Sequence, residues 1–268
     1  MTYRWISFTT DYGLRDGFVA ACRGVIARLA PDVQVIDVTH EVPPQQIRHG
    51  ATALAQTAPY LPESVHLAVV DPGVGTARRG VVVVARRGLL VGPDNGLLLP
   101  AASALGGVVE AFELSDPSLR LPETSATFHG RDIFAPAAAH LALGVAPSEF
   151  GERVPDLVTL PDPLVAAFPG KLVAEVVTVD HFGNVQLAAS PADLALTELT
   201  GAVSVHSARV AVRAVVGRTF GDAARGEAVL YTDSAGRLAV AINGGSAAAT
   251  LGLGPAQECT ITSSPTAS

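Results

Sequence analysis

The stretch VHLAVVDPGVGTARRG, residues 65–80, decides the fold of this 268-residue chain. Val65–Val70 is a short apolar run bounded by turn residues, which is typical of a strand buried inside a sheet. Asp71 ends this run and opens a glycine-rich loop, and Arg78 stands at the far end of that loop. The stretch therefore predicts a buried strand that delivers an acidic side chain and a fixed cation to one edge of a sheet.

The segments around this strand alternate between extended and helical patterns. Extended runs occur at residues 3–9, Val33–Val38, Gly80–Ala85 and Leu89–Val91, and helical apolar stripes occur at Phe18–Leu29, Ile47–Ala58 and Ile133–Leu143. Strands that alternate with helices predict an α/β fold with a mostly parallel sheet, which we assign to an N-terminal domain over residues 1–156. Asp16 is placed to cap the helix that starts at Phe18.

The pattern changes after residue 156. Residues 157–169 are rich in proline and predict a linker. A smaller, all-β, barrel-like domain is expected over residues 170–262, because short β-rich runs are separated there by glycine: Lys171–Val179, Val185–Leu187, Val210–Val216, Ala228–Tyr231 and Leu238–Ile242. Residues 263–268 are predicted to form a disordered tail.

Composition excludes several classes of partner. The net charge of −7 and the lack of a basic stripe argue against nucleic-acid binding. No run approaches the roughly 18 apolar residues of a membrane span, and no signal peptide is evident. Cys22 and Cys259 have neither metal nor disulfide spacing, which suits a reducing compartment, so we expect a cytoplasmic protein without membrane contact.

Polar side chains follow three consecutive predicted strands: Asp11 the first, Thr39 and His40 the second, and Asp71 the third. Side chains just beyond the carboxyl ends of strands line the ligand crevice of open α/β sheets. His129, in TFHGRD, stands before the last apolar helix of this domain. An acid, a cation and an imidazole at one edge can orient and deprotonate a water. The alternative is a structural turn held by an Asp71–Arg78 ion pair.

Three further features have both a functional and a structural interpretation. Asp11 suits a bidentate grip on a ribose diol. In DHFGN, Asp180 and Phe182 provide an anion beside an aromatic face, suited to an amino or sulfonium group, although the same residues are typical of a hairpin. Asp94, in PDNG, is interpreted as part of a tight turn. No metal-site spacing is present, and Arg78 would oppose a cation held by Asp11, Asp71 and His129.

Six motifs, in order along the chain, carry a family resemblance: TTDYGLRDGF, VIDVTHEVPP, VVDPGVGTARR, GPDNG, FHGRDIFAP and VDHFGNV. The chain resembles the S-adenosylmethionine hydroxide adenosyltransferases, the hydrolytic relatives of fluorinase and chlorinase. The resemblance implies hydrolysis of S-adenosylmethionine to adenosine and methionine by attack of water at the ribose C5′. It also implies a homotrimer with each active site between two subunits, and neither a cofactor nor a metal.

Site residues transfer from the resemblance position by position. It implies that Asp71, Arg78 and His129 are catalytic and that Asp11 holds the ribose hydroxyls. It further implies contacts with the methionine part of the substrate, or with its surroundings, from Asp16, Asp180 and Ser234. Contacts with adenosine are implied for Phe182, Asn184, Phe220 and Gly244. The halogenases carry an arginine directly after the serine, where this chain has Ala235.

Asp71 separates the hydrolases from the halogenases, because a carboxylate repels a desolvated halide. The fluorinase carries an aromatic hydroxyl residue at this position and has an inserted loop after the strand Val81–Ala85 that this chain lacks. The alternatives are a chlorinase-like halogenase, a metal-dependent nucleotide or nucleoside hydrolase using Asp11, Asp71 and His129, and a non-catalytic protein that binds adenosine or S-adenosylmethionine. Which of Asp71 and His129 is the final base is left open.

Overall fold

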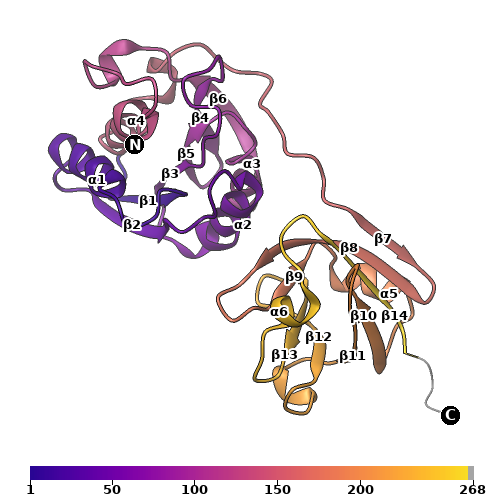
Figure 1. Ribbon diagram of the computed structural model, residues 1–268. Coiled ribbons are helices and arrows are strands. Elements are labelled where there is room, and N and C mark those ends of the chain that lie inside the picture. Colours follow the sequence, from indigo (N-terminus) through magenta and orange to yellow (C-terminus); the bar gives the residue numbers. More distant parts are fainter. Residues whose placement is uncertain (265–268) are drawn as a thin grey trace. The chain divides into compact units, whose positions relative to one another are not determined.

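The computed structural model describes residues 1–264 and divides into two compact units, the first spanning Met1–Leu160 and the second beginning at Pro161 (Figure 1). The first unit is α/β and the second is built mainly of strands. The predicted fold class is confirmed. No helix within residues 1–264 is long and apolar enough to cross a membrane.

The first unit contains a six-stranded sheet with the order β2-β1-β3-β5-β4-β6. Its strands are β1 (Trp5–Thr10), β2 (Gln34–Thr39), β3 (Val65–Val69), β4 (Gly80–Ala85), β5 (Gly88–Pro93) and β6 (Val108–Glu113). The four strands β2, β1, β3 and β5 run parallel, whereas β4 pairs antiparallel with both β5 and β6. The mostly parallel sheet that the sequence predicts is therefore present.

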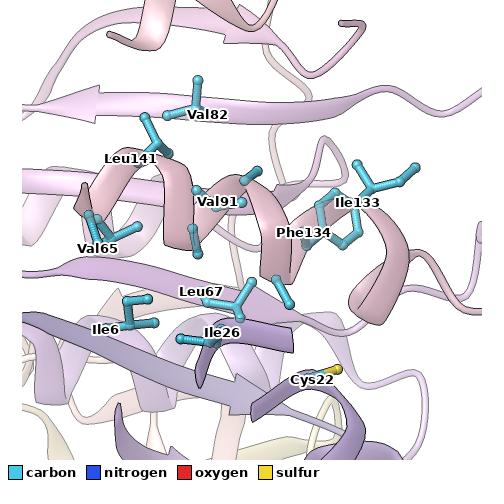
Figure 2. Packing of buried hydrophobic residues seen from close by; sticks show 14 of the residues in the cluster. Ile6, Cys22, Ile26, Val65, Leu67, Val82, Val91, Ile133, Phe134 and Leu141 are labelled. Carbon is cyan, nitrogen blue, oxygen red and sulfur yellow. The ribbon is translucent and has the colours of Figure 1, made fainter. Parts of the chain in front are cut away.

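Helices cover both faces of this sheet (Figure 1). One face carries α1 (Phe18–Leu29) and α4 (Ala135–Ala142), which continues a π-helical turn at Gly130–Phe134, and the other carries α2 (Ile47–Thr57) and α3 (Leu99–Ala104). Figure 2 shows the first face, where Ile26 and Phe134 pack over Ile6 and Leu67 of the strands. All four are fully buried, and each contributes about 1.5–3 kcal/mol of hydrophobic stabilisation.

The topology places a switch point beside the carboxyl end of β1. Strands β2 and β3 lie on opposite sides of β1, and the helices that connect them, α1 and α2, lie on opposite faces of the sheet. Strand order therefore reverses between β1 and β3, which is where open α/β sheets bind ligands. Thr10 of β1 pairs with Val69 of β3, so Asp11 and Asp71 follow neighbouring strand ends.

The second unit is a closed barrel of seven strands: β8 (Lys171–Val179), β9 (Val185–Leu187), β10 (Ala202–His206), β11 (Ala211–Val216), β12 (Ala228–Thr232), β13 (Leu238–Ile242) and β14 (Glu258–Ser263). Pairing of β14 with β8 closes the barrel, and β7 (Val165–Phe168) is added beside β8. Leu172, Val203, Leu230 and Ile261 are fully buried in its core. Two short helices, α5 (Pro191–Leu196) and α6 (Ala247–Leu251), and a 3-10 turn at Phe220–Asp222 also belong to this unit. The first unit has further 3-10 turns at Ala58–Tyr60, Pro117–Leu119 and Pro147–Glu149.

Three predicted boundaries need correction. The predicted linker contains β7, because Val165–Phe168 form a hairpin with β8 through a turn at Gly170, whose φ is +75°. The predicted tail starts too early, since Ser263 belongs to β14 and the Ser264 N–H donates to the Ala202 carbonyl; residues 265–268 lie outside the described residues. Asp16 does not cap α1, because the cap position falls on Gly17, one residue later.

Candidate active site

Asp71 and Arg78 form a bidentate ion pair across the glycine-rich loop that follows β3. The Arg78 Nε donates to Asp71 Oδ1 over 2.9 Å, and its Nη2 donates to Oδ2. The two side chains are 6% and 12% exposed, respectively. Arg78 also lies over the ring of Phe134, 5.1 Å from its centroid. Two parallel charge-assisted hydrogen bonds fix the plane of both groups.

His129 joins this pair through the same guanidinium nitrogen. Arg78 Nη2 lies 3.0 Å from His129 Nδ1. A guanidinium only donates, so Nδ1 is the accepting nitrogen and the neutral ring carries its proton on Nε2. Burial lowers the pKa of His129, and the charge of Arg78 lowers it further. The imidazole is therefore unprotonated at neutral pH, with its basic nitrogen facing the cation.

One contact holds the segment that carries His129 against the loop after β3, and hydrogen bonds within the segment fix its own shape. A Cβ on Gly75, which has a φ of +76°, would come closer than 3.0 Å to the carbonyl oxygen of Ala126, so the two loops touch backbone to backbone there. The fully buried Asp132 accepts from the Ser125 N–H over 2.8 Å and from Arg131 Nε over 2.6 Å. Only a glycine at position 75 allows the backbone of its loop to come this close to the carbonyl oxygen of Ala126.

Asp11 lies at the end of β1 and is oriented by the chain after β2. Its Oδ2 accepts from the backbone N–H of Gln45 over 2.9 Å. Gln45 has a φ of +66°, a conformation that costs a residue other than glycine on the order of 1–3 kcal/mol and is retained mainly at functional sites. Asp16 is exposed in the turn before α1.

The GPDNG motif does more than form the predicted turn. Asp94 is buried, accepts from Arg79 Nε over 3.0 Å and Nη2 over 2.7 Å, and accepts from the Val158 N–H over 2.9 Å. The Asn95 side chain donates to the carbonyl of Val70, which directly precedes Asp71. The motif therefore braces the end of β3. The sequence offered one indication of this buried ion pair: Asp94 is a charged residue between two apolar runs.

In the barrel unit, Asp180 organises the turn between β8 and β9. Its Oδ1 accepts from the N–H groups of Phe182 and Asn184 over 2.9 Å each, and its Oδ2 accepts from the Asn184 side chain over 2.7 Å. Gly183, with a φ of +82°, packs so closely on Ser246 that a Cβ would meet its hydroxyl. This framework leaves the ring of Phe182 76% exposed.

The remaining candidates of the barrel unit lie on other turns. Phe220 is 47% exposed, and its ring meets Tyr231 edge-on at 5.2 Å between centroids. Burial raises the pKa of Tyr231 to about 12, with Asp180 contributing through its charge. Ser234 is exposed in the turn between β12 and β13, and Gly244 is exposed with a φ of +76°. Tyr231 was not predicted as a neighbour of Phe220, because its strand pattern marks it only as a barrel residue.

The structure gives two other histidines structural partners. His40 Nδ1 is 2.9 Å from the Thr10 hydroxyl, and His66 Nδ1 is 2.7 Å from the Ser7 hydroxyl. Both rings are buried. Among residues 1–264, no group of three or more His, Cys, Asp or Glu side chains is arranged to hold a metal ion.

The model of the SAM hydroxide adenosyltransferase N-terminal domain matches residues 6–151, and that of the C-terminal domain matches residues 174–260. The chain belongs to the SAM hydroxide adenosyltransferase family. The two matched regions fall within the α/β unit and the barrel unit, respectively.

Individual relatives agree with this assignment. An (R)-S-adenosyl-L-methionine hydrolase from Salinispora arenicola is 58% identical over 261 residues, which cover 96% of this chain and 97% of the relative. A fluorinase from Nocardia brasiliensis is 30% identical over 279 residues, 91% of each chain. The crystal structure of an uncharacterized conserved protein from Thermotoga maritima superposes with a TM-score of 0.89 at 37% identity, covering 96% of this chain and 99% of that one.

The candidate residues form two groups, one in each unit. The α/β unit holds Asp11, Asp16, Asp71, Arg78 and His129, of which the last three are joined by hydrogen bonds. The barrel unit holds Asp180, Phe182, Asn184, Phe220, Ser234 and Gly244, of which Asp180, Phe182 and Asn184 share one turn. Their roles toward a substrate stay predictions.

Proposed function

We propose that this chain hydrolyses S-adenosylmethionine to adenosine and methionine and that it acts on the (R) epimer at the sulfonium. One observation carries the proposal: a single guanidinium, Arg78, is bonded to both an ionised acid and a neutral imidazole beside the switch point of the sheet. The relative at 58% identity, whose name specifies the (R) epimer, supports the same activity. The sequence motifs did not indicate the sulfonium configuration.

The chemistry follows from which atoms can donate and accept. A water that enters between Arg78 and His129 accepts a hydrogen bond from the guanidinium and donates one to Nδ1. Its oxygen forms a bond to C5′ while the C5′–S bond breaks, and the electron pair of that bond leaves on sulfur as neutral methionine thioether. The water proton passes to Nδ1 and then to solvent. Positioning of the water supplies roughly 7–11 kcal/mol, and the base about 10²–10⁴-fold in rate.

His129 is the better base of the two candidates. Both carboxylate oxygens of Asp71 already accept hydrogen bonds from Arg78. The Nδ1 of His129 has a single donor facing it, and a water can replace that donor. Asp71 then acts by holding Arg78 in place and by fixing the orientation of the water.

The same contacts argue for water over a halide or a metal. A halide at the position of the water would lie beside the carboxylate of Asp71, which repels it in a buried site. A metal held by Asp71 and His129 would have to displace Arg78 from both groups and then tolerate its charge. We therefore propose a reaction without a metal or cofactor, in the cytoplasm, where the buried, unpaired Cys22 and Cys259 suit a reducing environment.

We also propose a homotrimer whose active sites combine the α/β unit of one subunit with the barrel unit of the next. The family resemblance supports it, as do the exposed aromatic rings of Phe182 and Phe220, which are suited to stacking on adenine. Mixing Asp71→Asn subunits with Asn184→Ala subunits, each of which should have low activity alone, tests the shared site. We expect activity to return in the mixture, because some interfaces then combine two intact halves. No recovery after subunit exchange would contradict it.

The test of the reaction is chromatography of the products from each sulfonium epimer, with EDTA present and with or without chloride or fluoride. We expect adenosine and methionine from the (R) epimer whatever the halide. A 5′-halo-5′-deoxyadenosine would replace the hydrolase with a halogenase, and activity abolished by EDTA would favour the metal-dependent alternative. Binding without turnover would favour an adenosine-binding protein. In Asp71→Asn and His129→Ala we expect turnover at least about a hundredfold lower with binding retained.

A further inference from the structure

Tyr12, the residue after the ribose-binding candidate Asp11, contacts the chain on both sides of His129. On one side is Gly130, where a Cβ would come closer than 3.0 Å to the Tyr12 hydroxyl. The hydroxyl therefore occupies the space that any other side chain at position 130 would fill. On the other side is Phe128, whose ring meets that of Tyr12 edge-on, with centroids 5.8 Å apart.

Phe18, at the start of α1, completes an aromatic group with these two rings. Its centroid is 6.0 Å from that of Tyr12 and 5.1 Å from that of Phe128. The guanidinium of Arg131 lies over the ring of Phe128, 4.9 Å from its centroid. These ring contacts, edge-on at Phe128 and tilted between Tyr12 and Phe18, link the segment that carries His129 to the chain after β1.

The Tyr12 hydroxyl keeps its proton. Burial raises the pKa of Tyr12, and the charges of Asp11 and Asp71 raise it further. The phenol is therefore protonated at neutral pH, where it can donate a hydrogen bond but cannot act as a base.

We infer that Tyr12 is a positioning residue for His129, which links the segment carrying Asp11 to the segment carrying the proposed base. The expected effect on turnover rests on the proposed function, whereas the packing of Tyr12 against Phe128 and Gly130 does not. Tyr12 fixes the backbone at Phe128 and Gly130, and through them keeps Nδ1 of His129 directed toward Arg78. The Gly130 position lacks a side chain because the phenol needs that space.

Gly130→Ala is the most informative variant. Gly130 does not have a left-handed φ, and alanine favours a helical turn more than glycine, so the backbone itself accepts the change. The new methyl group must push Tyr12 away. We expect kcat to fall about tenfold to a hundredfold with a smaller change in KM, since a displacement of about 1 Å can cost that much. Tyr60→Ala, at an 83% exposed tyrosine, is the matched control and should leave kcat unchanged.

A double-mutant cycle separates positioning from general packing. Tyr12→Ala should lower kcat in the wild-type background and have no further effect in a His129→Ala background, because its effect passes through His129. Equal losses in both backgrounds would overturn the inference. Tyr12→Phe, which keeps the ring contacts, should retain most of the activity, and in Gly130→Ala it should restore part of the loss.

Histidine-labelled NMR gives a readout that does not depend on catalysis. The ring signal of His129 is identified by its loss in His129→Ala. We expect Gly130→Ala to raise the pKa of His129 toward 6.5, because the displaced ring becomes more exposed and moves away from Arg78. An unchanged titration in the folded variant would overturn the inference. If the wild type hydrolysed neither epimer, the proposed function would fail while this titration still tested the position of Tyr12.

Discussion

Gly75→Ala tests whether the contact between the two catalytic loops matters for function. Gly75 has a φ of +76°, where alanine costs about 1–2 kcal/mol in folding free energy. Its new Cβ would also have to move about 0.6 Å from the Ala126 carbonyl oxygen to reach a separation of 3.0 Å. Ala126 is three residues before His129. If that shift reaches the imidazole, the Arg78–His129 distance grows from 3.0 Å to about 3.6 Å, beyond hydrogen-bond range.

Gly170→Ala is the matched control for backbone strain. Gly170 has a φ of +75°, and a Cβ there would meet nothing within 4 Å. Both variants should lose about 1–2 kcal/mol in urea unfolding from the left-handed conformation alone. Only Gly75→Ala should also lose activity, by about tenfold to a hundredfold in kcat for adenosine release at saturating substrate. Equal kcat values in the two folded variants would refute the proposed coupling between the loops.

Three further predictions concern charge. Activity should fall as the pH drops through the pKa of His129, which lies below 6.5. In Asp71→Asn the fall in the remaining activity should occur at lower pH, because the charge of Asp71 raises that pKa in the wild type. A pH–activity profile whose acid side does not move would contradict this. Asp11→Ala should weaken substrate binding by more than about tenfold in calorimetry, by loss of charge-assisted hydrogen bonds, and unchanged affinity would defeat the ribose assignment. Burial lowers the pKa of His66 to about 4, so the folded protein binds fewer protons than the unfolded chain below pH 6.5. About 3 kcal/mol of stability should be lost between pH 6.5 and 4, and an equally steep loss in His66→Gln would contradict this.

Sequence patterns predicted the elements that bury a regular apolar face. The observed bounds of α1, β4, β8, β9 and β13 coincide with their predicted ranges, because an unbroken helical stripe or β-rich run defines each. β14 was missed, since only Cys259 and Ile261 of its residues are buried and polar residues separate them. It becomes a strand by pairing with β8 and β10, which are far away in the sequence.

Some residues of the candidate site were predictable from the sequence and others were not. Asp11 and Asp71 were predictable because both follow strands whose carboxyl ends must meet in a parallel sheet. The roles of Asp94 and Tyr12 were not, because their partners lie far along the chain: Asp94 binds the backbone of Val158, and Tyr12 packs on Phe128 and Gly130. No local pattern encodes such contacts, which depend on how complete loops pack.

The most direct test of the proposed reaction is hydrolysis of (R)-S-adenosylmethionine in oxygen-18 water, with mass spectrometry of both products. Attack of the water held by Arg78 and His129 at C5′ predicts one oxygen-18 atom in the 5′-hydroxyl of adenosine and none in methionine. Unlabelled adenosine would show that the entering oxygen does not come from water. Methylthioadenosine together with labelled homoserine would show attack on the methionine side of the sulfonium, and either result would contradict the proposed role of the Asp71–Arg78–His129 set.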